Sequence, residues 1–339
     1  METIASIGNW ISANESVLSG AVAIIVLLGI MASMIGIVYR RVAKARLTDG
    51  TGVEPSHSSQ ITLKSLSAPA PYPIRFAKSD GLRIAYAVQG SGTRDIVMAP
   101  GIISHLNIMF HMPPIRDTIE SVGAFGRIIL FDKRGQGLSD PCLNVPDLDE
   151  RVHDIEAVMD AAGVGQAILY GVSEGGPMCL KFAHDHPERV KGLILLGTTA
   201  CWLQGDDFPM GIEEKLLDQL VAAWGTGVLR DIFFPSITRE QMDDKAYQGF
   251  EHLVATRHSV RQLVDFMKKT DVRPLLPNIR CPSLVIHFSG DLAVPIRLGR
   301  AIAESLPNAE FLEVSGTDHA DLSQSREGIE RVRQFVESL

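Results

Sequence analysis

The stretch from Ala167 to Pro177 constrains the fold of this chain more than any other. It reads AILYGVSEGGP: a short apolar run, a glycine-rich turn, and a proline that opens a helical pattern. The apolar run is typical of a buried strand, and proline is favoured in the first turn of a helix. A strand that reverses sharply into a helix holds its central residue at strained backbone angles, which only small neighbours permit. The sequence therefore predicts a strand, a tight turn and a helix, with Ser173 at the bend.

A serine in this position matches the nucleophile elbow, the pattern G-x-S-x-G, from Gly171 to Gly175. In that arrangement the serine Oγ projects above the end of a sheet. So short a pattern also occurs by chance, and the strand before it and the helix after it are the features that support the functional interpretation. The alternative is an ordinary strand-to-helix turn that happens to contain a serine.

Apolar runs alternate with amphipathic stretches along residues 72–339, which we expect to form one domain. Alternating strands and helices are typical of an α/β fold, here a mostly parallel central sheet with helices on both faces. The first two runs, separated by Ser79-Asp80-Gly81, have the pattern of a hairpin. Asp149 to Ala162 has helical spacing and ends at a glycine. The predicted strands are Ile74–Ala77, Leu82–Val88, Asp95–Ala99, Arg127–Phe131, Ala167–Val172, Val190–Leu196, Cys281–Phe288 and Ala309–Val314.

The pattern changes between about Thr198 and Asp271, where helical stretches carry several large aromatic residues. An insertion at this point of the chain would lie over the carboxyl edge of the sheet, where ligands bind in α/β folds. We expect a helical cap, about residues 198–271, that shapes an apolar pocket. An ordinary helical subdomain with an aromatic core is the alternative, and the two interpretations are compatible.

Three residues that each follow a predicted strand form a candidate catalytic triad: Ser173, Asp291 and His319. Their order along the chain is the one expected of a triad on such a sheet. His319 would take the proton of Ser173 and return it to the leaving group, and Asp291 would orient the imidazole and stabilise its cationic form. Asp318 and Asp132 are competing acids, but the first adjoins the histidine and the second lies in another loop.

An acyl-transfer site also needs donors for the developing oxyanion. The backbone N–H groups of Ile102 and Glu174 are the candidates, because one lies in the loop after the Asp95–Ala99 strand and the other follows the serine. A plain strand-to-helix connection is the alternative for the first loop. The glycine-rich loop from Asp132 to Ser139 lacks the spacing of a phosphate-binding loop, and we expect its role to be structural.

Charge and cysteine usage exclude several classes of function. The net charge of −8, without a basic cluster, argues against a nucleic-acid partner. The four cysteines are widely spaced and form no C-x-x-C pair, so neither a zinc site nor a disulfide framework is indicated. His184 and His186 lie two positions apart, a spacing that does not place both on one side of a helix. We expect no metal site at these histidines.

The N-terminal part predicts a membrane anchor. After a short segment, residues 1–16, no charged residue occurs from Val17 to Tyr39, which is long enough to cross a hydrocarbon core of about 30 Å as a helix. Arg40 and Arg41 follow at once, so the positive-inside rule places the rest of the chain in the cytoplasm. Residues 40–71, rich in Gly, Ser and Pro, are predicted to be a linker. A cleaved signal peptide, a misassigned start and a buried helix are the alternatives.

The segment from about Tyr72 to Leu339 resembles the α/β-hydrolase superfamily. The resemblance rests on four groups: DKRGQGLS from Asp132, the elbow GVSEGG from Gly171, Gly290-Asp291 with Val294-Pro295, and Gly316 with His319. More narrowly, the chain looks like a bacterial branch whose hydrolase domains are sometimes fused to nucleotide cyclases, which favours a bacterial inner membrane for the anchor. Many relatives carry His-Gly where this chain has Pro100-Gly101, so substrate preferences tied to that histidine are not expected here.

The resemblance implies hydrolysis through an acyl-enzyme without metal or cofactor, and a serine at the elbow argues against dehalogenase chemistry. We expect a membrane-anchored serine hydrolase that cleaves a small-molecule carboxylic ester, thioester or lactone. A carbon–carbon bond hydrolase with the same triad is one alternative. A non-catalytic ligand-sensing protein that keeps the hydrolase fold is the other.

Overall fold

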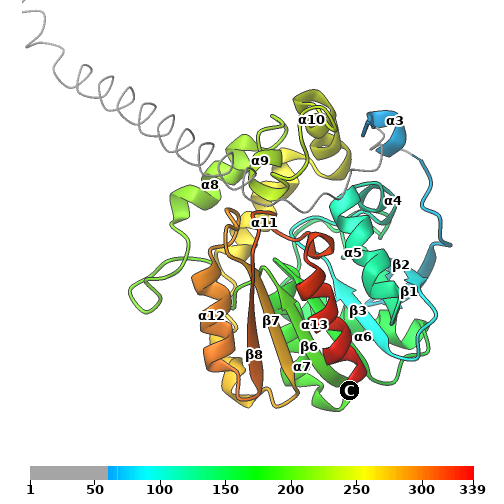
Figure 1. The fold of residues 1–339 in the computed structure, drawn as a ribbon, viewed down its shortest axis with the longest axis vertical. Coiled ribbons are helices and arrows are strands. Elements are labelled where there is room, and N and C mark those ends of the chain that lie inside the picture. Colours follow the sequence, from blue (N-terminus) through cyan, green and yellow to red (C-terminus); the bar gives the residue numbers. More distant parts are fainter. Residues whose placement is uncertain (1–59, 67) are drawn as a thin grey trace, which may run out of the picture. The chain divides into compact units, whose positions relative to one another are not determined.

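The computed structural model describes residues 60–66 and 68–339, and an eight-stranded sheet forms its centre (Figure 1). The strand order is β1-β2-β4-β3-β5-β6-β7-β8. The strands are β1 (Arg75–Ser79), β2 (Leu82–Gln89), β3 (Asp95–Ala99), β4 (Arg127–Phe131), β5 (Ala167–Val172), β6 (Val190–Leu196), β7 (Ser283–Phe288) and β8 (Ala309–Val314).

Strand direction agrees with the prediction from the sequence. The hairpin β1–β2 and the pair β2–β4 are antiparallel, and every other neighbouring pair is parallel. Asp80 and Gly81 form the hairpin turn with φ angles of 48° and 84°. The predicted α/β architecture with a mostly parallel sheet is therefore confirmed.

Helices connect the strands and cover the sheet. They are α3 (Leu63–Leu66), α4 (Leu106–Phe110), α5 (Pro113–Gly123), α6 (Leu148–Ala161), α7 (Gly175–Asp185), α8 (Glu214–Ala223), α9 (Arg230–Phe233), α10 (Asp244–Val254), α11 (Arg257–Met267), α12 (Ile296–Ser305) and α13 (Arg326–Glu337). Three short 3-10 helices add to these: η1 (Pro187–Arg189), η2 (Arg273–Asn278) and η3 (Leu322–Gln324).

Each face of the sheet has its own apolar core. On one face, side chains of α6, α7 and α12 pack against the strands, as Val158, Met178 and Ile302 do. On the other face α5 and α13 contribute Val122 and Val332. Because both faces are covered, the central strand β5 is buried along its whole length.

Helix α6 shows how local sequence sets an element that later matters for the site. Asp147 accepts a hydrogen bond from Glu150 N (2.9 Å), and the Glu150 carboxylate accepts one from Asp147 N (3.2 Å), which forms a capping box. This cap satisfies two backbone N–H groups at the helix start. The helix therefore begins at Leu148, and Arg151 is held in its first turns, fully buried.

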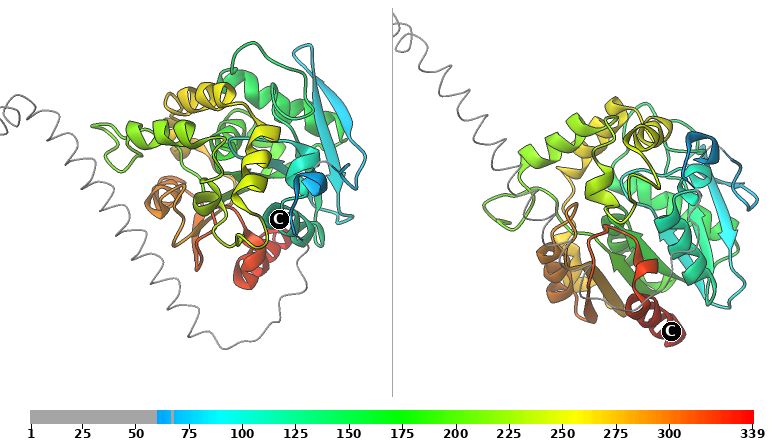
Figure 2. Two further views of the ribbon diagram at one scale, coloured as in Figure 1. Left: turned by 90° about the horizontal axis from the view of Figure 1, so that it is seen from above. Right: turned by 45° about the horizontal axis from the view of Figure 1, so that its top comes forward.

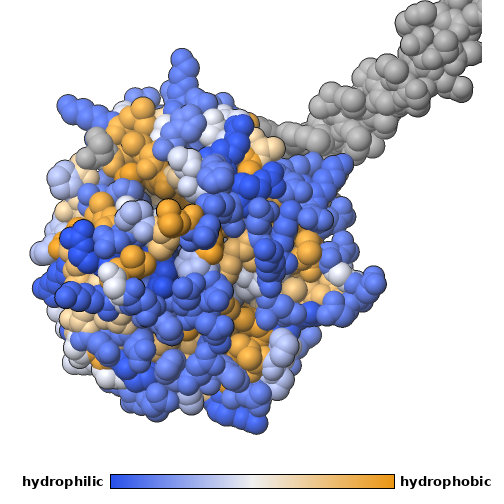
Figure 3. All heavy atoms as spheres, turned by 180° about the vertical axis from the view of Figure 1, so that it is seen from behind, coloured by the Kyte–Doolittle hydropathy of each residue, from blue (hydrophilic) through white to orange (hydrophobic). Residues whose placement is uncertain are grey.

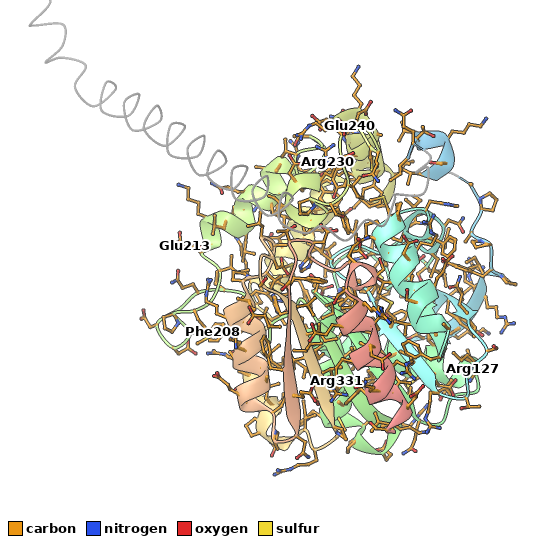
Figure 4. All side chains as sticks on the ribbon, viewed as in Figure 1. Arg127, Phe208, Glu213, Arg230, Glu240 and Arg331 are labelled. Atoms are coloured by element: carbon orange, nitrogen blue, oxygen red, sulfur yellow. The ribbon has the colours of Figure 1, made fainter. Side chains whose placement is uncertain are left out.

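Helices α8 to α11 form a cap beside one edge of the sheet. Figure 2 shows these helices, green to yellow, above the strands. The cap has its own core, which includes Trp224, Tyr247 and Phe250. Arg230 of α9, labelled in Figure 4, is completely buried there and donates to Met242 O (2.7 Å). The carboxylates of Asp231 and Asp244 lie within 2.9 Å of its guanidinium group, so the buried cation is paired.

The end of the predicted linker belongs to the folded domain. Ile61 and Leu66 are buried in the same core as the cap, and residues 63–66 form α3. Ile61 N donates to Gln241 O of the cap (2.8 Å), and Tyr72 OH donates to Leu106 O (2.8 Å). The prediction that the linker extends to residue 71 is corrected accordingly: a few apolar side chains between the serines are enough to attach this segment to the domain.

The predicted anchor, residues 17–39, lies outside the described residues, as do residues 1–16 and most of the linker. Within residues 60–66 and 68–339, no helix has both the length and the apolar character needed to span a bilayer. Figure 3 shows the face opposite to that of Figure 1, where hydrophobic patches are separated by hydrophilic side chains.

Candidate active site

Ser173 occupies the predicted turn between β5 and α7. Its φ angle is 52°, the left-handed region that a non-glycine residue adopts only under strain. Ser173 N donates to Leu196 O (2.9 Å), and Gly176 N donates to Ser173 O (3.0 Å). A β-carbon on Gly175 would collide with the carbonyl oxygens of Ala99 and Pro100, so glycine is required there. These contacts keep the strained serine in place.

Asp291 follows β7 and is held by several hydrogen bonds. Its Oδ1 accepts from Ala293 N (2.8 Å) and Val294 N (3.0 Å), and its Oδ2 lies 2.8 Å from Nδ1 of His319. Burial by itself would raise the pKa of this carboxyl group. The charge of His319 and the hydrogen bonds from His287, His319 and Val294 N outweigh burial and lower the pKa of Asp291 to about 2. Asp291 is therefore an anion at any pH near neutrality.

His287 lies next to this carboxylate, on β7, and no pattern in the sequence identified it as a site residue. Its Nε2 lies 2.7 Å from Val294 O and 3.5 Å from Asp291 Oδ2. The side chain is completely buried. His287 therefore joins the loop after β7 to the strand and supports the position of Asp291.

His319 lies in the loop after β8, where the cap also contacts it. His319 N donates to Phe233 O (3.0 Å), and the two rings are 5.8 Å apart between centroids. Its ring also lies against Gly197, because a β-carbon there would come within 3.2 Å of Cε1. Gly197 directly follows Leu196, the residue that accepts the hydrogen bond from Ser173 N. The end of β6 and the glycine after it therefore contact both the backbone of Ser173 and the ring of His319.

The structure pairs His319 with Asp291 and leaves the other ring nitrogen available. His319 Nε2 is buried and has no hydrogen-bond partner among the described residues. Nε2 is the atom that would accept a proton from Ser173, and the structure contains no bond between the two residues. Active sites often tighten such contacts only when substrate is bound.

The two competing acids bind elsewhere. Asp132 Oδ2 accepts from Leu106 N (3.1 Å) and Leu138 N (2.8 Å), so it joins two loops of the domain. Burial raises the pKa of Asp132 to about 7, although these backbone N–H groups oppose the shift. Asp318 accepts hydrogen bonds from Ser236 in the cap. Neither competing acid bonds the imidazole of His319 in the structure.

The two candidate oxyanion donors flank the nucleophile. Ile102 belongs to the loop after β3, and a β-carbon on its neighbour Gly101 would come within 3.3 Å of Ser173 Cβ. Glu174 directly follows the serine at the start of α7. Both donors therefore belong to backbone segments next to Ser173.

A buried ionic cluster behind these donors was missed in the sequence. Lys133 Nζ contacts the Glu174 carboxylate and Gly101 O, and Arg151 binds both oxygens of Glu174. All three charged side chains are at most 2% exposed. We name Lys133, Arg151 and Glu174 the ionic cluster. The sequence offered two weak signals for this cluster. Lys133 is a charged residue in a glycine-rich loop, and Glu174 is a charged residue in the elbow.

Burial and the neighbouring charges shift the pKa values of Lys133 and Glu174. Burial lowers the pKa of the Lys133 ammonium to about 8, in spite of the neighbouring Glu174 charge, which raises it. Burial would raise the pKa of Glu174, but Arg151 and Lys133 outweigh burial and lower it. Glu174 therefore remains an anion. Arg151 also lies over the ring of Phe266 in α11, with its Cζ 4.5 Å from the centroid, so the cap covers the ionic cluster.

Two observations concern metal ions and disulfide bonds. In the described part of the chain, no group of three or more His, Cys, Asp or Glu side chains is arranged to hold a metal ion. Cys142, Cys179, Cys201 and Cys281 are all free thiols.

One known protein family matches most of the domain. Residues 96–320 match the family described as serine aminopeptidase, S33. Among curated relatives, a putative carbamate hydrolase, RutD, of Azorhizobium caulinodans is 27% identical over 252 residues, which cover 72% of this chain and 91% of the relative. The karrikin insensitive 2 receptor CA of Petunia hybrida is 25% identical over 244 residues, covering 68% of this chain and 86% of the receptor.

Solved structures share the fold. An esterase from Exiguobacterium antarcticum superimposes with a TM-score of 0.66 at 25% identity, covering 77% of this chain and 98% of the esterase. An enol-lactonase from Burkholderia xenovorans has a TM-score of 0.63 at 21% identity, covering 78% of this chain and all of the lactonase (100%).

Proposed function

Because the chain belongs to the serine aminopeptidase S33 family of α/β-hydrolases, we propose that it is a serine hydrolase that cleaves carboxylic esters, thioesters or lactones through an acyl-enzyme. The observation that carries this proposal is the bond between His319 Nδ1 and Asp291 Oδ2 (2.8 Å), with a strained serine at the adjacent elbow. An imidazole held by an anionic aspartate is the arrangement that activates a serine.

The proposed reaction has two halves. In the first, His319 Nε2 takes the proton of Ser173 while Oγ attacks the substrate carbonyl, and the resulting imidazolium is stabilised by Asp291. The N–H groups of Ile102 and Glu174 bind the oxyanion, and collapse of the tetrahedral intermediate releases the leaving group with the proton from His319. In the second half, water attacks the acyl-enzyme with the same assistance, and Ser173 is regenerated.

An apolar acyl or alcohol part of the substrate is proposed from the surroundings of the site. Ile102 and Ile103, in the loop beside the serine, are buried in the same apolar cluster as cap residues such as Leu229, Phe234 and Ile237. Such side chains favour apolar groups and exclude water. The esterase that shares the fold at 25% identity supports the choice of ester substrates.

The test is replacement of the nucleophile. We expect Ser173→Ala to reduce kcat for a short-chain aryl ester about 10⁴-fold or more, because an activated nucleophile is lost. The circular dichroism spectrum should match that of the wild type, since the Ser173 hydroxyl makes no hydrogen bond to any other residue within 60–66 and 68–339. A Ser173→Ala variant as active as the wild type would remove the basis of the proposal.

A second candidate function is ligand sensing, which the similarity to the karrikin insensitive receptors supports. A fluorophosphonate probe separates the two. Covalent labelling of the wild type at Ser173, absent from Ser173→Ala, favours the enzyme. A folded wild type that resists the probe favours the sensor.

We also propose that residues 17–39 tether the domain to the cytoplasmic face of a membrane, on the strength of the uncharged run followed by arginines. In sealed vesicles with the cytoplasmic side inward, external protease should leave the domain intact. Digestion without detergent would contradict this orientation.

A further inference from the structure

The ionic cluster connects the two candidate oxyanion donors from behind. Lys133 Nζ donates both to Gly101 O, in the loop after β3, and to the Glu174 carboxylate at the start of α7. These two segments are far apart in sequence, and each carries one of the donors. Lys133 lies in a third segment, just after β4.

The contact with Gly101 O acts on Ile102 through a single rigid unit. The carbonyl of Gly101 and the N–H of Ile102 belong to one planar trans peptide and point in opposite directions. An ammonium group that fixes the oxygen therefore fixes the direction of the N–H. It also polarises the amide, which makes the N–H a better donor.

The contact with Glu174 acts on the second donor. The carboxylate is clamped by Lys133 and by both terminal nitrogens of Arg151, so the residue that supplies the N–H has little freedom to move. The ionic cluster carries two cations against one carboxylate. Its excess positive charge, which the neighbouring carboxyl group of Asp132 offsets in part, is buried behind the place where the oxyanion would form, and buried charges are screened less than exposed ones.

We propose that Lys133 is a positioning residue of the oxyanion hole, which holds the N–H groups of Ile102 and Glu174 in register and supplies positive charge behind them. This inference rests on the proposed serine hydrolase function. A purely structural buried ion pair would affect folding and leave the transition state unchanged, whereas Lys133 acts on the transition state.

The experiment compares Lys133→Met with Arg134→Met. Arg134 is the next residue of the same loop, is 5% exposed and is paired with Asp154 (2.8 Å), but it contacts neither Gly101 nor Glu174. Both variants remove one buried cation of this loop. Activity on 4-nitrophenyl butyrate is measured per folded active site, counted by fluorophosphonate labelling.

We expect Lys133→Met to lower kcat about 10- to 100-fold, somewhat less than direct loss of an oxyanion donor, with KM within about twofold of the wild type. The dissociation constant of butylboronic acid, which mimics the tetrahedral intermediate, should rise by the same factor, while inhibition by the product butyrate should not change. Arg134→Met should keep kcat within about threefold. A Lys133→Met variant with normal kcat or normal boronate affinity would overturn the inference, as would an equal loss of kcat in Arg134→Met.

Where Lys133→Met does not fold, Lys133→Gln is the second variant, because its amide group is polar and can still donate a hydrogen bond but carries no charge. It should lower kcat about tenfold with the same rise in the boronate dissociation constant, and an unchanged kcat overturns the inference. A wild type that neither hydrolyses the ester nor reacts with the fluorophosphonate contradicts the proposed function itself, which distinguishes that failure from a failure of Lys133.

Discussion

Ser236 of the cap donates both its backbone N–H and its hydroxyl to the carboxylate of Asp318, the residue directly before His319. One residue further, His319 N donates to Phe233 O. Three hydrogen bonds therefore join the last residue of α9 and the segment after it to the loop that carries the proposed base. Cap position and histidine position are coupled by these contacts.

The first prediction concerns this connection. Asp318 is 4% exposed, and burial raises its pKa while the Ser236 hydrogen bonds oppose the shift, so loss of a donor leaves a buried carboxyl group poorly satisfied. We expect Ser236→Ala to lower the free energy of unfolding by about 1 to 2 kcal/mol. KM should rise several-fold as the cap loosens, with a smaller change in kcat.

Ser305→Ala serves as its control, because that hydroxyl donates to Ala301 O on the exposed surface of α12, outside the cap. Urea denaturation and steady-state kinetics give both measurements. If the two alanine variants behave alike, Ser236 does not couple the cap to the histidine loop.

A second prediction follows from the low pKa of Asp291, about 2 in the folded protein against an ordinary value of 3.8. A carboxyl group whose folded pKa is depressed stabilises the fold above its unfolded pKa, and this stability is lost as the pH falls through the folded value. The wild type should therefore lose, relative to Asp291→Asn, about 2 kcal/mol of stability between pH 5 and pH 2. The measurement is the difference between their urea midpoints at pH 6, 4 and 3. A difference that is constant with pH would show that the aspartate is not ionised more readily in the folded state.

A third prediction concerns Asp132, whose effect on the stability of the fold should depend on pH in the opposite direction. Its folded pKa of about 7 lies above the ordinary 3.8, so the folded state binds its proton more tightly and this group destabilises the fold progressively as the pH rises from about 4 to about 7. The oxygen of an asparagine can accept the same two N–H bonds without a charge. We expect the free energy of unfolding of Asp132→Asn, relative to that of the wild type, to increase by about 1 to 4 kcal/mol between pH 4 and pH 8. Thermal unfolding of the two proteins across this range checks the sign, and a gain toward acid pH would refute it.

The sequence by itself was sufficient for the strands, for the strained turn at Ser173 and for the choice of Asp291 over its competitors as the partner of His319. These features depend on local patterns. Apolar runs indicate buried strands, and small residues indicate a tight turn. A polar residue just after a parallel strand lies at the carboxyl edge of the sheet. The helical spacing in Asp149 to Ala162 likewise predicted the buried side of α6.

Only the tertiary structure determined which charged side chains meet. Lys133, Arg151 and Glu174 come from three different segments, and no spacing relates them. Their contacts exist because the loops after β3 and β4, the start of α6 and the elbow converge in one dry region. There a charge is stable only with a partner, whatever the distance along the chain. The packing of distant elements also decides that Ser236 meets Asp318 and that Ile61 and Leu66 are buried in the core of the cap. A periodic pattern reports which side of an element is buried, and the packing of elements determines what lies against it.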